Sequence, residues 1–143
     1  MEIRVMSMED YDGVYQLWTN TDGMGMRRLD DSFEGIHKFL KRNPCTNFIA
    51  HNENEIIGVI LCGHDGRRGS IYHTAVKPKY RGKGIGKALV KATLDALKRE
   101  EINKVGLVAF VSNESGNAFW ESLGFTKRDD LVYRNLTINE LNV

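Results

Sequence analysis

The chain has 143 residues, of which 41% are hydrophobic and 27% charged, and its formal net charge is +1. This length and balance are typical of a soluble globular protein, so we expect a single domain over residues 1–143. The near-neutral charge argues against a dedicated nucleic-acid binder, and no apolar run is long enough to cross a bilayer. The first residues also lack the apolar core of a signal peptide, so we expect a cytoplasmic protein with no membrane partner.

The chain contains only two cysteines, Cys45 and Cys62. They are too few and too irregularly placed for a disulfide framework or a thiolate metal site. We therefore expect two free thiols and no bound metal. Cys45 is a poor candidate for a nucleophile, because no base lies near it in the sequence.

The first third of the chain is expected to form one strand and two helices. Residues 3–6 form the strand, and a capping box from Ser7 to Asp10 then begins the first helix, with Asp10 in place of the usual glutamate. After an irregular stretch, the second helix begins with Asp30 or Asp31 as its N-cap. Apolar residues at helical spacing predict that one face of each helix is buried.

The middle of the chain is expected to form three strands. An antiparallel hairpin covers residues 47–62, and a further strand covers residues 70–76. The loop between them, residues 63–69, is typical of a hairpin turn, although its His, Asp and Arg side chains can also contact an acidic substrate. Strict alternation along the third strand places Tyr72, Thr74 and Val76 on one face and Ile71, His73 and Ala75 on the other.

A glycine-rich loop follows this strand and leads into a helix expected over residues 85–100. Glycines alternate at Gly82, Gly84 and Gly86, so that a ligand can approach the backbone amides closely. The helix adds unpaired N–H groups and the positive end of its dipole at the same place. The loop therefore predicts an anion site for a phosphate or pyrophosphate, with positive charge supplied by Arg81, Lys83 and Lys87.

Two familiar phosphate-binding loops do not fit this spacing. In a P-loop alignment on Gly86-Lys87, the first glycine falls on Arg81 and the magnesium-binding hydroxyl falls on Ala88. The dinucleotide fingerprint needs G-x-G-x-x-G, and the glycines here are one residue too close together. A nucleotide-binding domain is therefore a weak alternative.

The last third of the chain is expected to complete the sheet. Residues 105–111 form an apolar strand that pairs in parallel with strand 70–76, because a helix connects the two. Asn113 or Ser115 caps a short helix that Gly124 ends. The tail is expected to add one or two strands around residues 131–136, which close the edge of the sheet.

Two motifs resemble the GNAT-type N-acetyltransferases. One is Arg81-Gly82-Lys83-Gly84-Ile85-Gly86, which fits the family spacing Arg/Gln-x-x-Gly-x-Gly/Ala, and the other is the segment from Asn113 to Leu123-Gly124-Phe125. The resemblance covers about residues 3–125. It implies an α/β (α+β) fold with a mixed central sheet of about six to seven strands, comprising an antiparallel hairpin region and one parallel pair, flanked by about four helices.

The resemblance also implies the activity and its co-substrate. GNAT-type enzymes move the acetyl group of acetyl-CoA to a primary amine by direct attack in a ternary complex. The acceptor, a small molecule or a protein, approaches the connection between the first two helices, and homodimers are common. The matching cofactor positions are Ala75 and Val76 for the pantetheine arm, Arg81, Gly82, Lys83, Gly84, Ile85, Gly86 and Lys87 for the pyrophosphate, and Asn113, Asn117 and Trp120 in the second motif.

One position departs from the family pattern. Trp120 stands where many members carry a tyrosine that protonates the leaving thiolate, and an indole N–H is no practical acid. This departure permits an alternative function, a coenzyme-A-binding module without turnover.

Candidate catalytic residues must therefore come from elsewhere in the chain. His73 is the candidate base because its ordinary pKa lies near neutrality, although a buried structural histidine or a water base are alternatives. Tyr72 is the candidate acid. Further candidates are Tyr133 in the tail and His64 and Asp65 in the hairpin loop.

Overall fold

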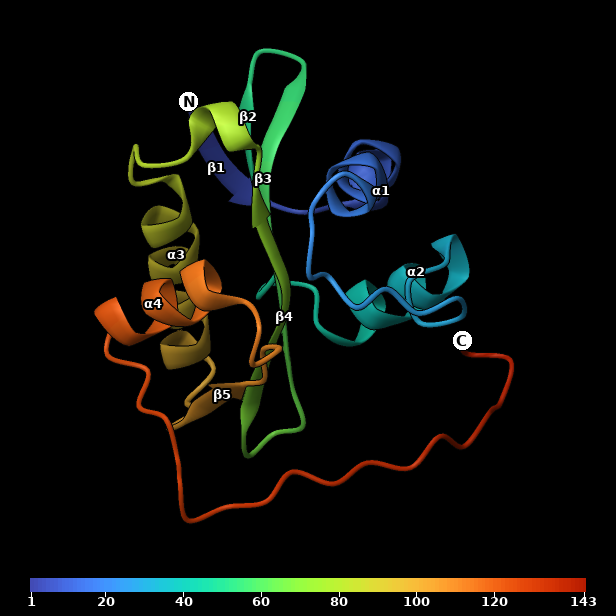
Figure 1. Cartoon of the computed structure of the whole chain (residues 1–143). Helices are drawn as coiled ribbons and strands as arrows, with labels where there is room; N and C mark the ends of the chain where they lie inside the picture. Colours follow the sequence, from blue (N-terminus) through green and yellow to red (C-terminus); the bar gives the residue numbers. More distant parts are fainter.

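The computed structural model describes residues 1–143 as one five-stranded sheet with helices on both faces (Figure 1). The strands lie in chain order, each antiparallel to the one before it except for the last pair, which is parallel. The strands are β1 (Glu2–Val5), β2 (Phe48–Asn52), β3 (Glu55–His64), β4 (Gly69–Val76) and β5 (Val105–Leu107).

Four helices cover the sheet, two on each face (Figure 1). On one face, α1 (Tyr11–Thr19) and α2 (Phe33–Arg42) bury an apolar cluster around Trp18 and Ile36. On the other face, α3 (Ile85–Arg99) buries a cluster around Leu89, against which α4 (Glu114–Ser122) packs its aromatic side chains. The α/β fold with a mixed sheet and four flanking helices is therefore confirmed.

The start of α1 agrees with the prediction, whereas the cap of α2 differs from it. The capping box before α1 forms, because Ser7 N–H donates to the Asp10 carboxylate at 2.9 Å within the short turn η1 (Met8–Asp10). The cap of α2 is Ser32 and not an aspartate, since Ser32 Oγ accepts from Gly35 N–H at 3.0 Å. Asp31 is thereby left to bond elsewhere.

A bulge interrupts the alternation of β4. Val59 pairs with Ala75 and Leu61 pairs with Tyr72. Between these two pairs, β4 therefore has one residue more than β3. The extra residue resets the alternation, so Tyr72 and His73 both face α1 and α2. The expectation that they lie on opposite faces is wrong for this reason.

The parallel pairing of β4 with β5 is confirmed but short. It runs over three residue pairs, from Gly69–Val105 to Ile71–Leu107. The predicted strand to residue 111 is too long, because the pairing stops where the bulge of β4 begins. Beyond this point, residues 72–76 of β4 have β3 on one edge and no strand on the other, so the sheet opens between β4 and the chain that follows β5.

The C-terminal tail forms no strand, so the sheet has five strands and not six to seven. Residues 126–141 run outside the body of the protein, from α4 round to the side of α2 (Figure 1). Two physical reasons apply: β5 offers only three residues for pairing, and strand formation depends on neighbours against which side chains can pack. Apolar side chains of the tail, including Leu131, Val132 and Tyr133, remain exposed.

None of the four helices combines the length and the apolar character needed to span a bilayer.

Candidate active site

The glycine loop between β4 and α3 forms an open cradle of backbone amides. Gly82 and Gly84 have φ of +75° and +82°, which favours glycine, and a Cβ at either position would have no other atom within 4 Å. The N–H groups from Gly82 to Lys87 make no hydrogen bond within the protein. Unpaired amides, the helix dipole and the open space above them fit a pyrophosphate.

Basic side chains surround this cradle. Arg81 Nε donates to the carbonyl of Val76 at 3.0 Å, which fixes the loop to the end of β4. Lys79 and Lys83 place their ammonium groups 5.2 Å and 5.5 Å from the centre of the Tyr80 ring. Lys87 is exposed on the first turn of α3. These basic side chains give the loop a positive electrostatic potential, which favours binding of an anion.

The two remaining cradle positions also serve the packing of α3. Ile85 is buried in the α3 cluster, so only its backbone is available to a ligand. A Cβ on Gly86 would approach Phe119 to 3.1 Å, so this glycine also lets α4 lie close to α3.

The free edge of β4 lies next to the cradle. Ala75 is buried on the α1 side and Val76 packs on the α3 side, so their backbone faces the opening between β4 and β5. An extended ligand with amide groups can pair with such an edge like an added strand.

The asparagines of the second motif are partly engaged within the protein. Asn113 Oδ1 accepts from Gly116 N–H at 3.0 Å, so of the two predicted caps, Asn113 and Ser115, it is Asn113 that caps α4. Asn117 Nδ2 donates to the carbonyls of Phe110 and Asn113 at 3.0 Å and 2.9 Å. The amide N–H groups of Asn113 and the side-chain carbonyl of Asn117 remain available for a ligand.

Trp120 belongs to an aromatic cluster on α4. Its ring lies 5.0 Å from Phe119 and 5.1 Å from Phe125, in edge-on contacts, and these rings pack against the α3 cluster. Its indole N–H makes no hydrogen bond within the protein. The cluster fixes the side chain by packing on both sides.

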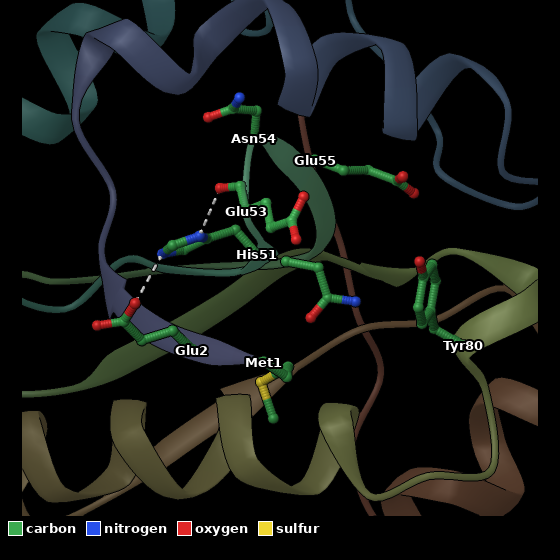
Figure 2. A pocket seen from close by; sticks show the side chains of 8 residues that line it. Met1, Glu2, His51, Glu53, Asn54, Glu55 and Tyr80 are labelled. Carbon is green, nitrogen blue, oxygen red and sulfur yellow. Dashed lines mark hydrogen bonds and ion pairs between the residues drawn. The ribbon is translucent and has the colours of Figure 1, made fainter.

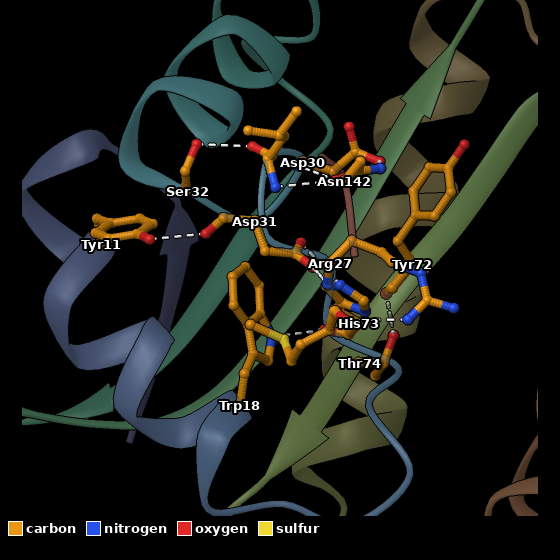
Figure 3. A network of polar contacts seen from close by, with 12 residues as sticks. Tyr11, Trp18, Arg27, Asp30, Asp31, Ser32, Tyr72, His73, Thr74 and Asn142 are labelled. Carbon is orange, nitrogen blue, oxygen red and sulfur yellow. Dashed lines mark hydrogen bonds and ion pairs between the residues drawn. The ribbon is translucent and has the colours of Figure 1, made fainter. Parts of the chain in front are cut away.

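His73 lies at the centre of a polar network on the α1 face (Figure 3). Its Nε2 is 2.9 Å from Asp31 Oδ1, and its ring packs edge-on against Trp18 with centroids 5.1 Å apart. The indole of Trp18 donates to the His73 carbonyl at 3.1 Å. The His73 side chain is 16% exposed and that of Asp31 is 7% exposed, so the pair is shielded but reachable.

Asp31 is itself held in place by α1 and by its own loop. Its second carboxylate oxygen accepts from Arg27 N–H at 2.7 Å, and its carbonyl accepts from the Tyr11 hydroxyl at 2.7 Å. With the proton of His73 on Nε2 toward Asp31, Nδ1 has a free lone pair, and no group of the protein bonds to it.

Sequence reasoning missed Asp31 as a functional residue. Asp30, Asp31 and Ser32 are three consecutive N-cap candidates, and only one can cap α2. The surplus of capping residues was the available signal, but nothing local indicates that a partner lies 42 residues away in β4.

The other catalytic candidates fall into two groups. Tyr72 lies on the same face as His73, half exposed, with its ring 5.8 Å from that of Phe39. His64 pairs with Glu100 at 2.9 Å, and Asp65 accepts from two backbone N–H groups of its own turn, at the opposite end of β4 from the glycine loop. Tyr133 is exposed on the tail. Only Tyr72 joins His73.

Two of the hollows in the surface bear on ligand binding. The larger, about 1210 Å³, is lined by Glu2, His51, Glu53 and Glu55 with Tyr80 at one side (Figure 2). Its three carboxylates disfavour an anionic ligand. The smaller, about 480 Å³, lies beside Asp31 between α1 and α2, and its lining includes Tyr11, Tyr15, Phe33 and Val143. No group of three or more His, Cys, Asp or Glu side chains is placed to hold a metal ion.

Comparison with known proteins identifies the family. A model of the Acetyltransferase (GNAT) family matches residues 11–125. The chain belongs to the GNAT acetyltransferase family. An acetyltransferase of Sodalis glossinidius is 31% identical over 92% of both chains, and one of Pectobacterium atrosepticum is 31% identical over 90% of both.

Solved structures share the fold. The PaiA N-acetyltransferase of Thermoplasma acidophilum, in complex with coenzyme A, gives a TM-score of 0.76 at 23% identity, covering 90% of this chain and 91% of that one. Ard1 of Thermoplasma volcanium gives 0.77 at 21% identity, covering 87% and 82%. The predicted GNAT resemblance and its co-substrate, acetyl-CoA, are thereby confirmed, since GNAT acetyltransferases use acetyl-CoA.

Proposed function

We propose that this GNAT acetyltransferase moves the acetyl group of acetyl-CoA to a primary amine by direct attack in a ternary complex, with His73 as the general base. The observation that carries this proposal is the Asp31–His73 pair at 2.9 Å, which leaves Nδ1 of a shielded imidazole free. Acetyl-CoA supplies the activated thioester. The residues of the chain must bind it, orient the amine and remove a proton.

Binding falls to the backbone around the glycine loop. The N–H groups of Gly82, Lys83, Gly84, Ile85, Gly86 and Lys87 hold the pyrophosphate, with Arg81 adding charge. The free edge of β4 at Ala75 and Val76 pairs with the pantetheine amides, and Asn113 and Asn117 contact them from α4, beside Trp120. Support comes from the open cradle above Gly82 and Gly84 and from the unpaired edge of β4.

Deprotonation falls to His73. An amine must lose a proton to become a stable amide, and an imidazole with a free Nδ1 can accept that proton. Asp31 keeps the other nitrogen protonated and the ring in one orientation, as the acid partner does in hydrolase triads. The ring also packs against Trp18, which restricts its rotation.

The proton for the departing thiolate has a different source. Trp120 cannot supply it, and its indole is packed between two aromatic rings. Tyr72 is the proposed acid, since the bulge of β4 brings it to the same face as His73 and its side chain is half exposed.

A second candidate function is a coenzyme-A-binding module without turnover, which the tryptophan at position 120 favours. Two successive experiments distinguish the acetyltransferase from the binding module. The first is calorimetric titration with acetyl-CoA, with ATP as a control, and the second measures release of coenzyme A with a panel of amines. The panel contains small diamines and amino alcohols, and peptides with a free α-amino group or a lysine.

Release of coenzyme A that depends on one class of amine supports the acetyltransferase. Tight binding with no release above the rate without amine, across both classes, supports the binding module. Binding of ATP in place of acetyl-CoA would contradict both. A homodimer and a cytoplasmic location remain predictions, and sedimentation of the purified protein tests the first.

A further inference from the structure

The last two residues of the chain bond to the loop that carries Asp31. Asn142 Oδ1 accepts from the N–H groups of Leu29 and Asp30 at 2.9 Å and 3.0 Å, and Asn142 Nδ2 donates to the Asp30 carboxylate at 2.9 Å. The carbonyl of Val143 accepts from Arg28 N–H at 2.8 Å. Four hydrogen bonds thus join residues more than a hundred positions apart in the sequence.

This contact is confined to the end of the tail. Residues 126–141 make no hydrogen bond to the body of the protein, and their polar contacts are local, such as the pair of Arg128 with Asp130. A free tail of this length loses conformational entropy when its end is held. The hydrogen bonds of Asn142 and Val143 to residues 28–30 oppose this entropy loss and hold the end of the tail against the loop.

Apart from the Tyr11 hydroxyl, which donates to the Asp31 carbonyl, and the ring of His73, the turn over residues 27–32 bonds mainly to its own residues. Residues 20–32 form neither helix nor strand, and the N–H groups of Leu29 and Asp30 have no other acceptor in the protein. On its inner side, the turn is closed by Asp31, whose carboxylate takes the N–H of Arg27. On its outer side, it is closed by Asn142 (Figure 3).

We infer that Asn142 is a positioning residue: by clamping residues 28–30 it fixes Asp31, and through Asp31 it fixes the ring of His73. The inference rests on the proposed function for its consequence in catalysis, but the bonds of Asn142 to Leu29 and Asp30 and the pairing of Asp31 with His73 do not depend on that function. Asn142 touches neither co-substrate nor amine in this account. It acts on the rate because the clamped loop keeps the carboxylate 2.9 Å from Nε2.

The test uses the full chain with Asn142→Ala and, as a matched control, Asn135→Ala. Asn135 is an exposed asparagine in the same tail whose side chain makes no hydrogen bond. Long-range ¹H–¹⁵N spectra of the imidazole rings report which nitrogen carries the proton, and the His73 signal is assigned by its loss in His73→Gln. We expect one tautomer, with the proton on Nε2, in the parent and in Asn135→Ala, and a mixture in Asn142→Ala.

Kinetics supply the second measurement. Asn142→Ala should lower kcat about 5- to 10-fold while the affinity for acetyl-CoA stays within about twofold, because the cofactor loop lies elsewhere. In an Asp31→Asn background, the same change should have no further effect on kcat, since the two residues act in one chain of contacts. Independent, multiplying effects on kcat would contradict this.

The outcomes separate the inference from the proposed function. An unchanged His73 tautomer in Asn142→Ala overturns the inference, whatever the rates. A mixed tautomer with an unchanged kcat supports the clamp and overturns His73 as the base. A mixed tautomer with a lower kcat supports both.

Discussion

The two sides of the sheet build their halves of the site in different ways. The residues proposed to hold acetyl-CoA come from short stretches of sequence, namely the end of β4, the glycine loop that directly follows it and the start of α4, and the glycine loop offers backbone amides. On the α1 side, the network around His73 draws single residues from distant segments, namely Tyr11, Trp18, Asp31 and Asn142. One half is a local motif and the other is a product of the tertiary structure.

This difference has a physical consequence. A cradle of backbone amides at a helix N-terminus exists as soon as α3 forms, and side-chain changes in it alter charge or backbone conformation. A network of side chains exists only when α1, α2, β4 and the tail are all in place, so it can be weakened from any of them. Changes on the α3 side should therefore affect binding of acetyl-CoA, and changes on the α1 side should affect the rate.

The largest effect is expected from His73→Gln. Glutamine retains polar contacts but cannot take a proton, so kcat/KM at neutral pH should fall by about 10²- to 10⁴-fold, the usual contribution of a general base. The affinity for acetyl-CoA, measured by calorimetry, should change by less than about threefold.

A matched pair with Trp18→Phe sharpens this result. Phenylalanine keeps an aromatic ring beside His73 but removes the N–H that donates to the His73 carbonyl and part of the buried indole, and it leaves the imidazole itself intact, so its effect on the rate should be much smaller. A His73→Gln enzyme within about threefold of the parent rate would show that water is the base and that His73 is a structural residue.

The second effect is on binding, at Gly84. Aspartate there would have to adopt φ of +82°, which costs about 1–2 kcal/mol, and would place a negative charge at the pyrophosphate cradle. We expect acetyl-CoA to bind at least about 30-fold more weakly to Gly84→Asp, by calorimetric titration.

Gly66→Asp is the control for this change. Gly66 also has a positive φ, +89°, and open space around its Cβ, but it lies in the turn between β3 and β4, at the other end of the sheet. It should suffer the same backbone strain and bind acetyl-CoA like the parent. Equal weakening in the two variants would attribute the effect to strain and remove the support for an anion cradle.

The difference between a local motif and a network made by tertiary structure also explains which features could be predicted from the sequence. The glycine loop, α3 and one of the two predicted caps of α4, Asn113, agree with the structure, because each depends on residues that are close in the sequence. The parallel pair of β4 and β5 was also predicted, because a helical connection between two strands allows few arrangements.

The failures of prediction have a common cause in tertiary structure. The bulge of β4 depends on its register with β3, and it moved Tyr72 to the face of His73. The sequence predicts Asp30 or Asp31 as the N-cap of α2, but Ser32 is the cap and Asp31 pairs with His73 on another element. The tail carries an apolar run typical of a strand, but β5 is too short to pair with it. None of these is determined by a local pattern.

A smaller effect is expected on stability, at the start of α1. Burial opposes ionisation of Asp10, but hydrogen bonds from the Arg4 guanidinium and from Ser7 N–H outweigh it, so the pKa of Asp10 lies below its ordinary value. The folded state therefore binds this proton less readily than the unfolded chain. The resulting stability is fully present above the unfolded pKa and is lost as the pH falls through the folded pKa.

Asp10→Asn should accordingly lower the free energy of unfolding at pH 7 by about 1.5–3 kcal/mol, the usual contribution of hydrogen bonds to a charged group. Urea unfolding measured between pH 7 and pH 3 should show the difference between parent and variant shrinking below about pH 4. A difference that stays constant down to pH 3 would assign it to packing and not to the ionised pair. Binding of acetyl-CoA should be unchanged, because Asp10 supports α1 and not α3.

The smallest effect is expected from changing a thiol, and this change tests whether the amine attacks the thioester directly. Burial raises the pKa of the Cys62 thiol to about 12, so it stays protonated and unreactive at neutral pH, while Cys45 is exposed. Neither residue belongs to the cofactor cradle or to the network of His73. If the amine attacks the thioester directly, Cys45→Ser should keep kcat/KM within about twofold. A loss of more than about tenfold, with an acetyl group found on Cys45 of the parent enzyme after acetyl-CoA alone, would replace direct attack by a two-step transfer. Acetyl transfer would then proceed through a residue outside both the cofactor cradle and the network of His73, since neither contains a thiol.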